Sequence, residues 1–180
     1  MGVALTRHPT RALRPQARVG PTLWETSPTP MHPFPHHYTA TSFAGPDGDL
    51  RVESGGLPAL ATAAPAEFGG PGDRWSPETL LTAAVADCFA LTFRAVARAT
   101  GLAWTALRCE AEGTLDREDR TTRFTAFRLR ASLTVPAGTD TARALGLLER
   151  AERACLISNS LNAAVHLDAE VVVEEMAIAA

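Results

Sequence analysis

The fold is decided by one stretch of the sequence, Trp75-Ser-Pro-Glu-Thr-Leu-Leu-Thr-Ala-Ala-Val-Ala-Asp-Cys-Phe-Ala-Leu-Thr-Phe93. Ser76 is a favoured N-cap residue, Pro77 is tolerated at the first helical position, and the negative charge of Glu78 suits the N-terminal end of a helix dipole. Gly101 is a residue type that often follows the last turn of a helix. The sequence therefore predicts a helix over residues 77–100.

One apolar face of this helix contains a cysteine. Its residues recur at spacings of three and four positions: Leu81, Val85, Cys88 and Thr92, flanked by Leu80, Ala84 and Leu91. The pattern predicts that Cys88 faces the interior. Taken alone it favours a small core residue, because free cysteines are among the most buried residue types.

Composition restricts the class of protein. A chain of 180 residues with 46% hydrophobic content is long enough for one domain with a core. The net charge of −3 gives no basic field that would select nucleic acid or an anionic membrane. Three cysteines, without zinc-ligand spacing or a secretory signal, favour a reducing cytosol. We therefore expect a cytoplasmic protein without a metal or cofactor.

Residues 1–35 are rich in Pro and Arg and predict a disordered extension ahead of a domain over residues 36–180. The extension could be a targeting peptide, a disordered arm or, as we favour, translated sequence upstream of a start at Met31. Three histidines nearby could chelate a metal, but beside prolines they are more often solvated: His32, His36 and His37.

The remaining patterns predict strands on both sides of the central helix. Alternation of polar and apolar residues predicts strands over 38–43, 50–53, 57–63, 102–115, 124–135 and 165–176, with a charged loop at 116–123 and a second helix from Thr139 or Asp140 to Cys155. Cys109 is expected in the core, and the inner positions of the second helix are predicted to be Leu145, Leu148, either Ala151 or Glu152, and Cys155. The order βββ-α-ββ-α-β indicates an α+β domain with antiparallel sheets wrapped around the central helix.

Two motifs carry a family resemblance. Residues 76–89, preceded by Phe68-Gly-Gly-Pro-Gly72, are followed later by Glu152-Arg-Ala-Cys-Leu-Ile-Ser-Asn159. Over roughly residues 38–174 the chain resembles the osmotically inducible protein C and organic hydroperoxide resistance (OsmC/Ohr) family. The resemblance implies an intertwined homodimer, with active sites at the subunit interface.

The resemblance also implies a thiol peroxidase, with Cys88 as the peroxidatic and Cys155 as the resolving cysteine. Cys88 would attack a hydroperoxide, condense with Cys155 to a disulfide, and be regenerated by an external dithiol such as a lipoyl group or a thioredoxin-like protein. The start of the helix cannot activate Cys88, which lies about three turns further on, so a nearby arginine is needed.

In the family, an arginine held by the glutamate of the Pro-Glu motif has this role, and Glu78 matches that glutamate. The Ohr branch places the arginine in a Gly-Gly-Arg-Asp-Gly turn, where this chain has Pro46. Arg74 and Arg51 are the available substitutes. We favour Arg74 because it is close in sequence to Glu78.

Two alternatives keep the same residues but change the function. A redox-inert OsmC-like protein could bind a small molecule in the interface pocket, and Pro46 favours that alternative. Cysteine-dependent acyl transfer would need a histidine base near Cys88. The one histidine within the predicted elements, His166, is expected on the solvated side of the last strand, which disfavours acyl transfer.

Overall fold

The central helix α1 (Pro77–Thr100) has the bounds that the sequence predicts in the computed structural model, which describes residues 32–175. A capping box closes its first turn: the Thr79 N–H donates to the Ser76 hydroxyl at 3.2 Å, and the Ser76 N–H donates to the Thr79 hydroxyl at 2.8 Å. Gly101 ends the helix in the left-handed conformation, with φ of 66°. Local sequence alone therefore fixes both ends of α1.

The buried stripe of α1 is displaced from the predicted one. Its fully buried residues are Val85, Phe89, Phe93 and Ala97. Cys88 is half-buried and packs at the edge of the core, and Leu91 is 51% exposed, so the prediction of an interior Cys88 is met only in part. The two phenylalanines carry the largest apolar surface on the helix, so they decide which face the chain buries.

The main sheet contains β4 (Ala106–Glu118), β5 (Thr121–Val135) and β6 (Ala164–Val173). β4 pairs antiparallel with β5, whereas β6 pairs parallel with β5. Between β5 and β6 the chain forms α2 (Thr141–Ala154) and α3 (Leu156–Asn159), the kind of helical crossover that parallel neighbours need. The predicted α+β class is confirmed, and this sheet is mixed because its last strand runs parallel.

The hairpin between β4 and β5 is longer than predicted. Both strands continue through the charged stretch and meet at a two-residue turn of Asp119 and Arg120, with φ of 48° and 66°. Positive φ at both residues gives a turn whose twist matches that of the paired strands. The prediction of a loop at 116–123 is therefore wrong. The charged residues there indicate that the stretch is exposed, but exposed residues can still pair as strands.

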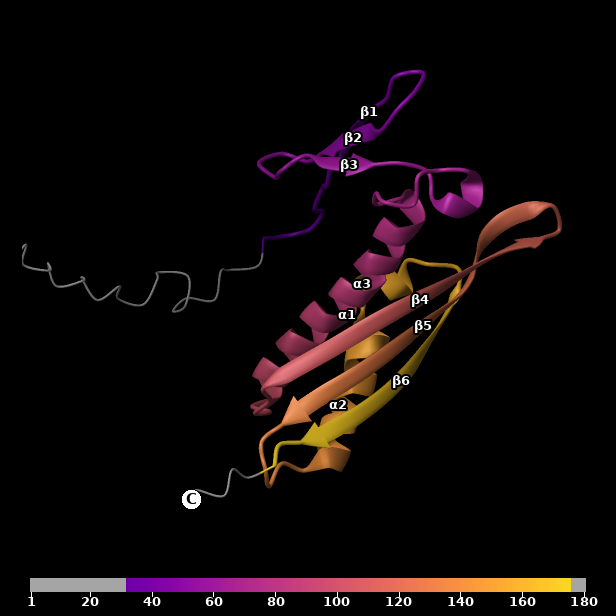
Figure 1. Cartoon of the computed structure of the whole chain (residues 1–180). Helices are drawn as coiled ribbons and strands as arrows, with labels where there is room; N and C mark the ends of the chain where they lie inside the picture. Colours follow the sequence, from indigo (N-terminus) through magenta and orange to yellow (C-terminus); the bar gives the residue numbers. More distant parts are fainter. Residues whose placement is uncertain (1–31, 176–180) are drawn as a thin grey trace, which may run out of the picture. The chain divides into compact units, whose positions relative to one another are not determined.

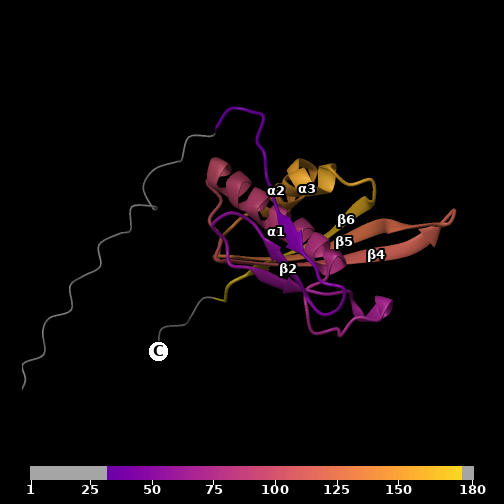
Figure 2. The same ribbon diagram turned by 90° about the horizontal axis from the view of Figure 1, so that it is seen from above.

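The three helices cover one face of this sheet (Figures 1 and 2). On this face β5 buries five residues whose alternation predicts it: Phe127, Leu129, Ala131, Leu133 and Val135. α2 begins at Asp140, whose carboxylate accepts from the Arg143 N–H at 2.9 Å. It buries Ala144, Leu147, Leu148 and Ala151, whereas Leu145 is 37% exposed and its predicted inner position is wrong.

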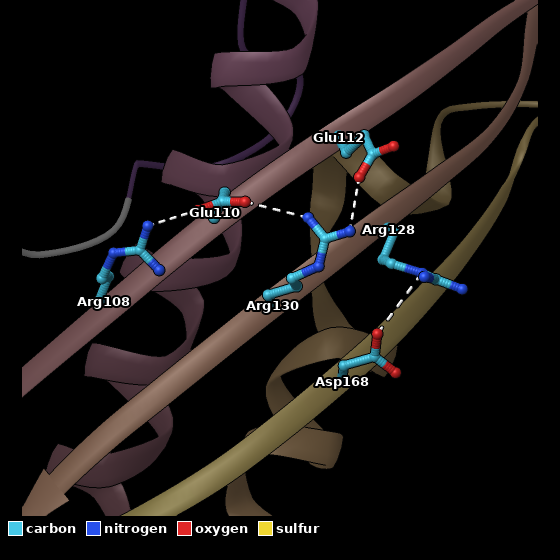
Figure 3. Close-up of polar contacts among 6 residues, drawn as sticks. All are labelled: Arg108, Glu110, Glu112, Arg128, Arg130 and Asp168. Atoms are coloured by element: carbon cyan, nitrogen blue, oxygen red, sulfur yellow. Dashed lines mark hydrogen bonds and ion pairs between the residues drawn. The ribbon is translucent and has the colours of Figure 1, made fainter.

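The opposite face of the sheet has charged side chains that pair across the strands (Figure 3). Arg130 bridges Glu110 at 3.0 Å and Glu112 at 2.6 Å, and Arg128 lies 3.5 Å from Asp168 on β6. Hydrogen bonding to Arg108 and Arg130 holds the pKa of Glu110 below its usual range. This face is solvated, as the alternation along β5 predicts.

A second sheet precedes α1. It consists of β1 (Thr41–Phe43), β2 (Leu50–Glu53) and β3 (Leu60–Thr62) in antiparallel order, so all six predicted strands are present, the first and third shorter than predicted. The Ala63 N–H donates to the Trp75 carbonyl at 3.0 Å, which ties the end of β3 to the start of α1. The predicted extension over residues 1–35 lies almost entirely outside the described residues. The predicted start of translation at Met31 lies outside them as well.

Candidate active site

The structure brings Cys88 and Cys155 together from different elements. Cys88 lies on α1, and Cys155 stands between the end of α2 and the start of α3. The Ile157 N–H, two residues after Cys155, lies 3.5 Å from Cys88 Sγ, and the neighbouring Cys88 contributes to raising the pKa of Cys155. Both are free thiols. The pair that the sequence singles out is therefore assembled in a single chain.

The environments of the two sulfurs differ. Cys155 is 0% exposed, whereas Cys88 is half-buried. Burial raises the pKa of Cys155, hydrogen bonding from Ser158 opposes this rise, and the neighbouring Cys88 adds to it. Cys155 is thus held as a neutral thiol at neutral pH, with Cys88 as the more accessible sulfur.

Cys109 is the third cysteine and lies on β4. It stands opposite the buried Ala131, on the sheet face that the helices cover, and packs against the core as predicted. Burial raises the pKa of Cys109 to about 11, with a further contribution from Cys155 and an opposing one from Arg108. Cys109 is therefore a poor nucleophile at neutral pH.

We expect the alkylation of Cys109 by iodoacetamide in the folded protein to speed up by about tenfold per pH unit from pH 8 towards 11, because only the thiolate reacts. At about pH 8 it should be far slower than in the same protein unfolded in urea. Mass spectrometry of the alkylated peptides measures both rates. Equal rates in folded and unfolded protein would contradict the raised pKa.

A cavity of about 450 Å³ lies between the first turns of α1 and the strand β4. Its lining includes Glu78, Thr82, Ala86, Ala111, Gly113 and Phe124. One carboxylate oxygen of Glu78 is buried and has no hydrogen-bond partner within the described part of the chain. A buried carboxylate oxygen without a partner is costly, so this site calls for a donor or cation that residues 32–175 of a single chain do not supply.

Glu78 and Cys88 are not brought together within one chain. Ten residues of α-helix separate them, and at about 1.5 Å of rise per residue this is about 15 Å along the axis. Cys88 is also not among the residues that line the cavity beside Glu78. If the two act in one site, they must come from different copies of the chain.

The two candidate arginines are exposed and have other partners. Arg74 Nε donates to Asp49 at 2.8 Å, and a second nitrogen lies 3.0 Å from Asp73. The pKa of Arg74 is raised above its ordinary value, mainly by the hydrogen bond to Asp49. Arg51 pairs with Glu53, and its guanidinium lies 4.4 Å from the centre of the Phe43 ring. Within residues 32–175, the ion pairs of both arginines are thus with carboxylates other than Glu78.

A family model described as OsmC-like protein matches residues 70–170, which is more than half of the chain. The chain belongs to the OsmC-like family. This match spans Glu78, Cys88 and Cys155. It confirms the family that the two sequence motifs indicate.

Individual relatives agree with this membership. The chain is 29% identical over 139 residues to YmaD of Bacillus subtilis, an uncharacterized protein, covering 75% of this chain and 92% of YmaD. An OsmC-like protein of unknown function from Vibrio cholerae has a TM-score of 0.69 at 17% identity, covering 76% of this chain and 100% of that one. An organic hydroperoxide resistance protein from Legionella pneumophila has a TM-score of 0.61 at 26% identity. The match covers 76% of this chain and 96% of the Legionella chain.

Two groups in this OsmC-like site are not identified by sequence reasoning: the Ile157 N–H beside Cys88 and the Ser158 hydroxyl beside Cys155. The i, i+3 spacing of Cys155 and Ser158 in a short helical turn is the signal that could have pointed to the second.

His166 is exposed on β6, as predicted. Within residues 32–175, no group of three or more His, Cys, Asp or Glu side chains is arranged to hold a metal.

Proposed function

We propose that this OsmC-like protein is a cytosolic thiol peroxidase that reduces organic hydroperoxides in defence against oxidative stress. The observation that supports it most is the reduced Cys88–Cys155 pair, in which an accessible sulfur lies beside a fully buried one. The Legionella pneumophila relative is an organic hydroperoxide resistance protein, which supports the same substrate class.

The proposed cycle uses the two sulfurs in turn. The Cys88 thiolate attacks the O–O bond, so that an S–O bond forms and the alkoxide leaves and is protonated to an alcohol. The Cys155 sulfur then attacks the Cys88 sulfenic acid, forming the S–S bond and releasing water. An external dithiol, a lipoyl group or a thioredoxin-like protein, reduces the disulfide. No cofactor or metal takes part.

A homodimer is part of the proposal. α1 is strongly apolar, yet only 22% of its most apolar 18-residue segment is buried within the chain. An exposed apolar face of this kind marks an interaction site, and a second copy of α1 would cover it. Light scattering should give about twice the chain mass of 19.1 kDa. A mass of one chain at micromolar concentration would contradict the dimer.

A dimer could also bring Glu78 of one copy close to Cys88 of the other, although the two residues are far apart within one chain. If two copies of α1 pack antiparallel about a two-fold axis near Ala83, midway between Glu78 and Cys88, the first turn of one helix faces the middle of the other. Glu78 of one copy then lies near Cys88 of the other, and its unpartnered carboxylate oxygen can hold an arginine beside the thiolate. In this arrangement each active site takes residues from both copies.

We retain Arg74 as the proposed activating arginine, with Arg51 as the alternative. Arg74→Ala is expected to lower the rate of Cys88 oxidation by a hydroperoxide on the order of tenfold or more, because the thiolate loses its nearest positive charge. Arg51→Ala is the matched control and should leave the rate within about twofold. Stopped-flow oxidation measures both. Loss of rate in Arg51→Ala alone would assign the role to Arg51 instead.

A redox-inert binding protein is the second candidate. The cavity of about 450 Å³ beside Glu78 favours it, since its lining has several apolar residues and two carboxylates, Glu67 and Glu78, which suits a small ligand, and does not include Cys88. The two candidates differ in turnover. The peroxidase should consume cumene hydroperoxide with dihydrolipoamide or dithiothreitol over many cycles, and hydrogen peroxide more slowly. Absence of consumption with any dithiol would favour the binding protein.

A further inference from the structure

We propose that the backbone N–H of Ile157 is a catalytic group that stabilises the Cys88 thiolate from within the same chain. The inference rests on the proposed peroxidase function, because it assigns a source of activation to the cysteine that attacks the hydroperoxide. A hydrogen bond carries it: the Ile157 N–H donates to Cys88 Sγ at 3.5 Å. This donor adds to the arginine proposed above and does not require a second copy of the chain.

The break between α2 and α3 leaves this N–H without a helical partner. Cys155 has an extended conformation, with φ of −68° and ψ of 117°, so the hydrogen bonding of α2 stops there and α3 begins at Leu156. In an unbroken helix the Ile157 N–H would donate to the carbonyl four residues earlier. That carbonyl, of Arg153, instead accepts from the side-chain amide of Asn159 at 3.1 Å. The Ile157 N–H is therefore available to the sulfur.

The turn that carries the donor is held by its own backbone hydrogen bonds. The Asn159 N–H donates to the Cys155 carbonyl at 3.0 Å, and the Ser160 N–H donates to the Ile157 carbonyl at 3.0 Å. The half-buried side chain of Ile157 packs against the same core as Cys88. The donor is thus already in place before charge develops on the sulfur, so its effect needs no rearrangement of the turn.

A donor at this position favours the charged form of the cysteine. A thiolate accepts a hydrogen bond more strongly than a thiol does, so the N–H stabilises the thiolate relative to the thiol. The bond is partly buried, where an electrostatic interaction is stronger than in water. α3 has only four residues, so we assign the effect to this one N–H and not to a helix dipole. The thiolate is the form that attacks the hydroperoxide.

The same turn holds the resolving cysteine of the proposed cycle. Cys155 stands two residues before Ile157, so one short segment supplies both the donor to the Cys88 thiolate and the second sulfur. A displacement of this segment would remove both together. Cys88 is therefore activated by the Ile157 N–H only while the segment that carries Cys155 is in position.

Ile157→Pro tests the donor directly, because proline has no N–H and its fixed φ is tolerated in the first turn of a helix. The pH midpoint of Cys88 alkylation by iodoacetamide should rise by about one pH unit. At a pH below both midpoints this is about a tenfold smaller fraction of thiolate. Peptide mass spectrometry after timed quenching follows Cys88 alone. An unchanged midpoint in folded Ile157→Pro would overturn the inference.

Leu156→Pro is the matched control for the proline. It places the same ring one residue earlier, at the first helical position where proline is favoured, and leaves the Ile157 N–H intact. Ile157→Val shortens the side chain and also keeps the N–H. Both variants should keep the thiolate fraction of Cys88 within about twofold of wild type. A shift in Leu156→Pro as large as in Ile157→Pro would assign the effect to the turn and overturn the inference.

A second replacement removes the N–H alone. The α-hydroxy acid analogue of isoleucine at position 157 turns the amide into an ester, which keeps the side chain but has no N–H. The same rise in midpoint is expected, and an unchanged midpoint would overturn the inference even if Ile157→Pro does not fold. Alkylation uses no peroxide, so these results stand if the protein consumes no hydroperoxide, and that failure would count only against the proposed function.

Discussion

Cys88→Ser is expected to reduce hydroperoxide turnover on the order of 1,000-fold or more. The serine hydroxyl stays protonated at neutral pH and is a far weaker nucleophile towards a peroxide oxygen than a thiolate. The replacement is nearly isosteric at a half-buried position, so the fold should be retained. A ferrous–xylenol orange assay of cumene hydroperoxide, with dithiothreitol as the reductant, measures the loss.

Cys109→Ser is the matched control for this variant. Cys109 is also half-buried and packs against the same core, but its pKa of about 11 keeps it protonated and outside the proposed cycle. Its replacement should leave turnover within about twofold. If turnover survives in Cys88→Ser and is lost in Cys109→Ser, the peroxidatic cysteine is Cys109 and the proposed role of Cys88 is wrong.

Phe89→Ala is expected to lower the free energy of unfolding by about 3–5 kcal/mol, the largest stability effect of a single replacement that we predict. Phe89 follows Cys88 directly, is 0% exposed, and packs with the inner residues of β5 and α2. Its removal leaves a cavity under the turn of α1 that carries Cys88. Urea unfolding followed by circular dichroism measures the change.

Leu145→Ala is the control for the core variant, since Leu145 is 37% exposed on α2 although its spacing in the sequence predicts an inner position. Its replacement should cost less than about 1.5 kcal/mol, because most of the side chain keeps its contact with water. Comparable losses in the two variants would mean that the buried faces of α1 and α2 are assigned wrongly.

Features that depend on neighbouring residues could be predicted from the sequence. Both ends of α1 follow from Ser76, Pro77 and Gly101, which act within one turn of the helix. The inner face of β5 follows from strict alternation between Phe127 and Val135. The family assignment follows from two short motifs, each of which is continuous in sequence.

Features that depend on packing between distant elements could not be predicted. The stripe through Cys88 and the stripe through Phe89 are both periodic, and only their contact with β5 and α2 decides that the second is buried. β6 runs parallel to β5 because the chain crosses over through α2 between them. The alternation of residues within a strand does not indicate in which direction the strand pairs. The contact between Cys88 and Cys155 likewise requires the fold, and the sequence reaches it only through family resemblance.

The proposed activating arginine is the part of the site that neither the local pattern nor the described residues 32–175 place beside Glu78. Closeness to Glu78 in sequence favours Arg74, yet its ion pairs within residues 32–175 are with Asp49 and Asp73. Glu78 keeps a buried oxygen without a partner, and about 15 Å of helix separates it from Cys88. Both observations agree with a site that is complete only when two copies of the chain come together.

The formation of the Cys88–Cys155 disulfide in response to a hydroperoxide tests the central claim most directly. The reduced protein is mixed with one equivalent of cumene hydroperoxide, quenched with acid and alkylating agent, and digested for mass spectrometry. The proposed peroxidase predicts a peptide pair linked through Cys88 and Cys155, with Cys109 recovered in alkylated form. Recovery of all three cysteines as alkylated thiols, with the hydroperoxide intact, would contradict it.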